Sequence, residues 1–200
     1  MCRSLAVLLL LLVAIASATP IEMVLQASTP FVDRSRHMVI VAVRQTPSGT
    51  YDGVSADLYV RVLCPGEGHV YVETMPLSEL DTQASARVAA MVASMVAGIA
   101  FASCDYFVSI RADTPIIGGP SASAAMAVAF AAALLDLPLN QSVVMTGMIM
   151  PDGSIGPVGG IPAKLMAAAR RGAKVFLVPY GQTKAIEYVV EVEQGPGYIK

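Results

Sequence analysis

The chain has 200 residues, of which 55% are hydrophobic and 14% are charged. This composition suits one globular domain with a sizeable core and argues against a disordered or repeat protein. With a formal net charge of −2 the chain has no excess of basic residues, so we expect no nucleic-acid partner.

The N-terminus predicts an export signal. Arg3 precedes an apolar run over residues 5–16, and the small-residue sequence ASA at 16–18 matches a signal-peptidase site, so we expect cleavage after Ala18. The apolar run is shorter than the ~20 residues of a spanning helix, and an uncleaved anchor stays open as the alternative. We therefore expect an exported protein, secreted or membrane-anchored, with a signal peptide at 1–18, a lead segment at 19–36 and the main domain at 37–200.

The first part of the main domain predicts a strand meander. Residues 37–46, 53–63 and 70–74 are rich in β-branched residues, and the turn sequences PSGTYDG and PGEG separate them. Helices and strands then alternate, so the fold class is mixed α/β. In chain order we expect a helix from Asp81 to about Gly98, a strand at 105–112, a helix from Ser121 to about Leu137, a strand at 142–150, a helix with Pro162 in its first turn and Gly172 at its stop, and a strand at 174–179.

The helix that begins at Ser121 is apolar on every side, so we expect it to be buried in the core. The preceding Gly-Gly-Pro turn lets other groups approach the free N–H groups of the first helical turn, which can hold an anion or oxyanion. Ser121 can be a plain helix cap or a nucleophile held at the positive end of the helix. Ser123 is expected to be a second capping or packing residue.

The sequence predicts no metal and no cofactor. Cys64 and Cys104 can form one disulfide in an exported chain, or they can be two buried free thiols; both alternatives stay open. His37 and His69 form no zinc pattern with them, and we expect both histidines to be structural or exposed. The chain has no G-x-S-x-G elbow that would indicate a Ser-His-Asp hydrolase.

Three separated motifs resemble the proteolytic domain of the Lon protease family. They are GGPSAS before an Ala-rich helix, then MTG, then GPVGGIPAKLMAAARRGAKVFLVP, and the similarity covers roughly residues 35–182. The resemblance implies that Ser121 is the nucleophile, that Lys164 is the general base and that Thr146 orients the lysine, with Gly119 and Pro120 shaping the turn. It also implies polypeptide substrates and a hexameric ring.

The residue types fit this chemistry independently of the family. A lysine can take the proton of a serine hydroxyl when an apolar setting lowers its pKa. The sequence neighbours of Lys164 at 161–163 and 165–166 are apolar, whereas Lys174 and Lys184 border a strand and a polar segment. Without the other motifs, the sequence around Lys164 would predict a surface lysine, and that around Thr146 an ordinary strand residue.

The chain also departs from the family pattern. Many Lon proteases have an acidic residue three positions before the serine, where this chain has Gly118, and others have Asp immediately before it, where this chain has Pro120. The 200 residues contain no G-x-x-x-x-G-K-[ST] phosphate loop, so we expect ATP-independent cleavage of unfolded or flexible polypeptides. After VPYGQ the Lon pattern breaks off, which suggests a part of a longer protein.

The sequence leaves two other functions open. GGPSASAAMAV also resembles the Gly-Ser-rich phosphate loop of GHMP-type small-molecule kinases, which would bind ATP. A catalytically silent Lon-like domain would instead act as a binding or scaffold module.

Overall fold

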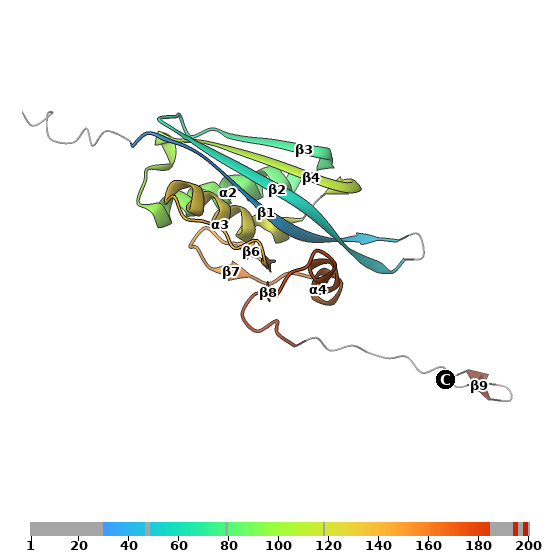
Figure 1. Cartoon of the computed structure of the whole chain (residues 1–200). Coiled ribbons are helices and arrows are strands. Elements are labelled where there is room, and N and C mark those ends of the chain that lie inside the picture. The colour runs from blue at the N-terminus through green and yellow to red at the C-terminus, as the bar shows by residue number, and fades with distance from the viewer. Residues whose placement is uncertain are drawn as a thin grey trace, which may run out of the picture.

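A four-stranded sheet organises the fold (Figure 1). The computed structural model describes residues 30–46, 49–78, 80–117, 119–184, 194–195 and 198–199, so the predicted signal peptide lies outside the described residues. The strand order is β1-β2-β4-β3. The strands are β1 (Val32–Gln45), β2 (Tyr51–Cys64), β3 (Val70–Ser78) and β4 (Asp105–Ile117). Together with the helices they confirm the predicted α/β class.

β3, the third strand in the sequence, does not pair with β2 as it would in a simple meander. β4 lies between β2 and β3, pairing antiparallel with β2 and parallel with β3. Parallel neighbours need a crossover connection, and helix α2 (Leu80–Ala97) supplies it between β3 and β4. A short 3₁₀ segment, η2 (Phe101–Ser103), then leads into β4.

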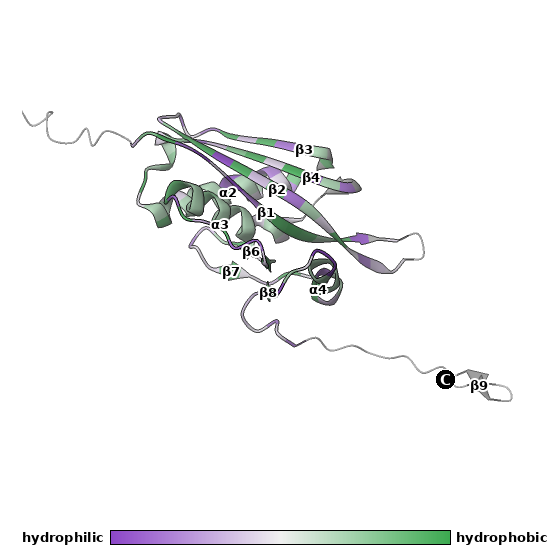
Figure 2. Ribbon diagram, in the orientation of Figure 1, coloured by the Kyte–Doolittle hydropathy of each residue, from purple (hydrophilic) through white to green (hydrophobic). Residues whose placement is uncertain are grey.

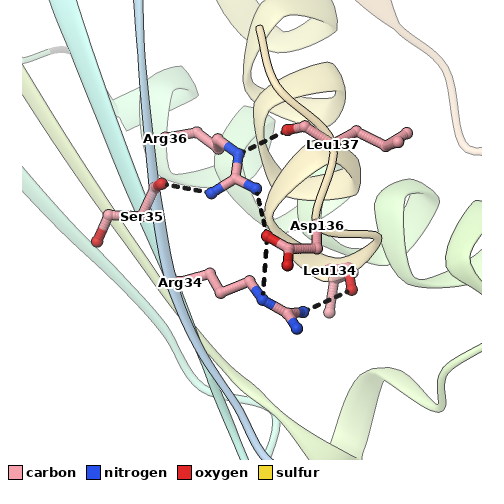
Figure 3. Close-up of polar contacts among 6 residues, drawn as sticks. All are labelled: Arg34, Ser35, Arg36, Leu134, Asp136 and Leu137. Atoms are coloured by element: carbon pink, nitrogen blue, oxygen red, sulfur yellow. Dashed lines mark hydrogen bonds and ion pairs between the residues drawn. The ribbon is translucent and has the colours of Figure 1, made fainter.

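β1 begins at Val32, five residues before the predicted start, so part of the expected lead segment belongs to the sheet. The polar side chains there have partners that the sequence pattern does not reveal. Figure 3 shows that Arg34 and Arg36 reach the end of helix α3 (Ser123–Leu134), where both contact the Asp136 carboxylate, at 3.3 and 2.9 Å. Arg36 also donates to the Leu137 carbonyl at 2.7 Å and so satisfies an acceptor just past the helix end.

α2 and α3 cover one face of the sheet, and Figure 2 shows mainly hydrophobic colouring on both. The prediction that the helix after Ser121 is buried is confirmed, with Val128, at 40% exposure, as its one exposed residue. The helix ends at Leu134 rather than near Leu137. Asp136 takes a left-handed φ of 56°, and the Leu137 N–H bonds back to the Ala132 carbonyl, which terminates the helix.

Cys64 and Cys104 form a disulfide that joins the end of β2 to the residue before β4. Both cysteines are fully buried, with their Cα atoms 4.4 Å apart. This settles the two alternatives that the sequence left open. No helix in the described part of the chain has both the length and the apolar character needed to cross a bilayer.

The predicted strand at 142–150 is broken in the middle. It forms β5 (Val143–Met145) and β6 (Met148–Ile149). Between them the Gly147 N–H bonds the Ser121 carbonyl, whereas the Thr146 N–H bonds the Leu177 carbonyl. β6 pairs antiparallel with β7 (Ile155–Gly156), and β5 pairs in parallel with β8 (Val175–Leu177). The remaining elements are η3 (Pro120–Ala122), α4 (Ile161–Arg170), β9 (Gln194–Gly195) and β10 (Tyr198–Ile199).

Candidate active site

Ser121 and Lys164 line one pocket of about 570 Å³, although they come from separate elements, η3 and α4. Its other walls come from Ala42 and Val43 of β1, Tyr51 of β2 and the loop at 157–160. The volume lies within the range typical of small-ligand sites. The fold thus brings together the two residues for which the sequence predicts chemistry.

Ser121 does not occupy a cap position in this structure. It lies inside η3, and the N-cap residues are Gly119 for η3 and Ala122 for α3. The serine is held through its backbone instead, because its carbonyl accepts the Gly147 N–H at 2.9 Å and the Thr146 hydroxyl at 3.2 Å. The Ser121 side chain is therefore not required to hold the turn.

Ser123, the second serine of the motif, is a buried packing residue, as predicted. Its hydroxyl donates to the Pro120 carbonyl at 2.6 Å and accepts the Ile149 N–H at 2.8 Å. These two bonds fasten β6 to the turn that carries Ser121. The Ser123 side chain thus holds the turn, whereas Ser121 is held through its backbone carbonyl.

Lys164 is 2% exposed, and burial lowers the pKa of its amine to about 8. The reason for its burial differs from the one that the sequence suggests. Its neighbours Leu165 and Met166 are 47% and 60% exposed, so the adjacent apolar residues do not surround it. The helical period places Lys164 on the same face as Ala167 and Ala168, and this face packs against β1 and β2.

Gly53 determines how closely α4 approaches the sheet. A Cβ atom on Gly53 would overlap with the carbonyl oxygen of Ala163, the residue before the lysine. Close contact between a strand and a helix backbone here requires the absence of a side chain. The position of Lys164 therefore depends on this glycine in β2.

We expect Gly53→Ala to displace the helix that carries Lys164. Overpacking at such a contact should lower the free energy of unfolding by about 1–3 kcal/mol, measured by urea denaturation, and should reduce any activity of the site. Gly159→Ala is the matched control, because a Cβ there would meet nothing within 4 Å. Equal stability of the two variants would contradict this account of the contact.

Thr146 lies at the break between β5 and β6 and is 2% exposed. Its hydroxyl donates to the Ser121 carbonyl, so its observed contact is to the serine's backbone. A hydroxyl that donates once can still accept through its lone pairs. The role of Thr146 in orienting the lysine amine stays a prediction.

Gln182 is a site residue that sequence reasoning missed. Its amide accepts the Val158 N–H at 2.9 Å and donates to the Val158 carbonyl at 2.8 Å, which holds the pocket loop before α4 from both sides. The one indication in the sequence is that Gln182 is a polar residue just after the last predicted strand, at 174–179. Tyr51, also missed, lies at the end of a hairpin and carries no motif.

His37 and His69, which we expect to be structural or exposed, are not among the residues that line this pocket. His37 lies on the sheet with its Nε2 atom 3.0 Å from an Asp57 carboxylate oxygen. His69 Nδ1 is 3.5 Å from a carboxylate oxygen of Asp105. Both histidine side chains are partly exposed, His37 within β1 and His69 just before β3.

The comparisons with known proteins concern the part of the chain that builds this site. The sequence profile of the Lon protease (S16) C-terminal proteolytic domain matches residues 77–195. Lon protease 1 of Hydrogenovibrio crunogenus is 42% identical over 78 residues, covering 38% of this chain and 10% of that protein. Lon protease of Buchnera aphidicola is 44% identical over 71 residues, or 36% and 9% of the two chains.

Lon protease 2 of Bacillus subtilis is 41% identical over 70 residues, which cover 35% of this chain and 13% of that protein. The matches thus span about a tenth of the length of these curated relatives. The profile match, in contrast, covers more than half of this chain and includes both Ser121 and Lys164. The chain therefore belongs to the Lon protease (S16) C-terminal proteolytic domain family.

Proposed function

We propose that this domain is a serine endopeptidase that uses Ser121 as nucleophile and Lys164 as general base on unfolded or flexible polypeptides. The observation that carries the proposal is a buried lysine, with its pKa lowered to about 8, in the same pocket as a serine that caps no helix. Such a lysine supplies the neutral amine that an activated serine needs.

In the proposed reaction, the Lys164 amine takes the hydroxyl proton while Ser121 Oγ bonds to the peptide carbonyl carbon. The carbonyl oxygen becomes an oxyanion. The Ser123 and Ala124 N–H groups already donate to the Pro120 and Gly147 carbonyls, so we assign its stabilisation to N–H groups earlier in the turn at Ser121. The lysine then gives its proton to the leaving amine as the C–N bond breaks, which leaves an acyl-enzyme. Water, deprotonated by the same lysine, hydrolyses the ester and restores the serine.

A serine-directed phosphonate and a flexible substrate test the proposal. We expect stoichiometric labelling at Ser121 and cleavage of an intrinsically unfolded protein such as casein, without nucleotide. Folded substrates should resist, because nothing in this chemistry supplies unfolding work. A chain that is neither labelled nor active would be a silent binding module, and tight ATP binding would instead indicate the small-molecule kinase.

We further propose that the domain acts outside the cytosol and without ATP. Two features support the location outside the cytosol: the signal-like sequence at 1–18 and the Cys64–Cys104 disulfide, a bond that persists mainly in oxidising compartments. We expect protein from the native source to begin near Thr19, as determined by N-terminal sequencing, and to resist thiol labelling before reduction. A chain that begins at Met1 would favour the membrane anchor.

We also propose that the domain self-associates. Leu165 and Met166 of α4 and Val175 and Leu177 of β8 are each 46–60% exposed. Exposed apolar side chains mark protein contacts where they gather into one patch. The family resemblance suggests a ring, and light scattering of the purified chain would give the number of subunits.

A further inference from the structure

A side chain from α2 holds the turn that carries the nucleophile. The Asp81 carboxylate accepts the Gly119 N–H with both oxygens, at 3.1 and 3.3 Å. Gly119 precedes Ser121 by two residues and lines the same pocket. Asp81 stands in the first turn of its helix and is partly buried, so the contact is shielded from water on one side.

The turn has little restraint of its own at this point. Gly118 and Gly119 are adjacent, and Gly119 has φ 90° and ψ 143°, a conformation that glycine adopts without strain but other residues do not. Pro120, which follows, has no N–H to contribute a bond. On the other side of the turn, the Ser121 carbonyl is fixed by Gly147. The contact from Asp81 is the corresponding restraint before the serine.

We propose that Asp81 is a positioning residue for Ser121. By holding the Gly119 N–H, its carboxylate fixes the position of Gly119, two residues before the serine, and thereby the direction of the serine side chain. The inference rests on the proposed peptidase function. Asp81 touches no reacting atom, so its contribution is to the geometry of attack, where an error of about 1 Å can cost about 10²-fold in rate.

Two substitutions of similar size separate the hydrogen bond from the charge. Asp81→Asn keeps an acceptor oxygen and loses the charge, whereas Asp81→Leu loses both. We expect kcat for peptide cleavage to fall about 10- to 100-fold in Asp81→Leu with KM changed by less than about twofold, because the lost interaction orients the nucleophile rather than binding substrate. Asp81→Asn should keep kcat within about threefold of the native value. Gln83→Leu, at an exposed position in the same helical turn, controls for a new surface leucine.

Amide hydrogen exchange at Gly119 provides a readout that does not depend on catalysis. We expect exchange to be about tenfold faster or more in Asp81→Leu and close to native in Asp81→Asn, because only the former loses the acceptor. Native exchange at Gly119 in Asp81→Leu would overturn the inference, as would an equal fall in kcat for both variants. If the native protein proves to be neither active nor labelled, the proposed function fails, while the exchange rates still decide whether Asp81 holds the turn.

Discussion

Ser121→Ala should abolish peptide cleavage and phosphonate labelling while leaving the fold intact. The loss follows because the hydroxyl oxygen is the proposed nucleophile and the pocket offers no other serine among its lining residues. The fold should survive because the structural bonds of Ser121 come from its backbone carbonyl, to Gly147 and Thr146, and these remain in the variant. We expect the free energy of unfolding to change by less than about 1 kcal/mol. Initial rates and urea denaturation measure the two effects.

Ser123→Ala is the matched control, because it removes the other serine of the same motif. The Ser123 hydroxyl makes two buried hydrogen bonds, so we expect a loss of about 1–3 kcal/mol in stability. The protein that remains folded should still be labelled. A Ser121→Ala protein that cleaves peptides at the native rate, with contaminating proteases excluded, would end the Ser-Lys interpretation.

Lys164→Ala should also abolish turnover, and Lys164→Arg should not restore it, because a guanidinium stays protonated and cannot act as a base. Lys174→Ala is the control, since that lysine is exposed and is not among the pocket-lining residues. Activity of Lys164→Arg close to the native level would contradict the role of general base. Rates should be compared at matched folded fractions.

The pH dependence of the native protein follows from the same amine. With its pKa lowered to about 8, about a tenth of Lys164 is neutral at pH 7 and about nine-tenths at pH 9. Because the neutral amine is the active form, kcat/KM should rise about tenfold across this interval and then level off. A profile that is flat from pH 7 to 9 would mean that this lysine does not set the rate.

The buried amine should also cost stability. Between pH 8 and about 10.5 the unfolded chain binds a proton that the folded chain has released, so stability rises with pH in this window. Below pH 8 the full penalty is present. Lys164→Met removes this penalty and should stabilise the protein at pH 7 by up to about 3 kcal/mol. The variant should therefore be more stable although it is inactive. Urea denaturation at pH 7 and pH 10 tests this, and the gain should shrink at the higher pH.

Part of the fold could be predicted because its signals are local. The uniformly apolar sequence after Ser121 predicted a buried helix, since a helix that is apolar on every side has no face for water. Runs of β-branched residues between turn sequences located β1 and β2, although the charged start of β1 was missed. The order of three motifs in one sequence pointed to Ser121 and Lys164 and to the family.

The tertiary structure decided everything that depends on residues distant in sequence. It placed β4 between β2 and β3, paired Cys64 with Cys104, and broke the strand at Thr146, because those bonds join segments whose separation carries no local signal. The burial of Lys164 is the clearest case. Its sequence neighbours predicted an apolar setting, but Leu165 and Met166 are exposed, and the sheet under α4 excludes the water. Desolvation is a property of the packed surroundings, so only the folded chain could determine the pKa of this amine.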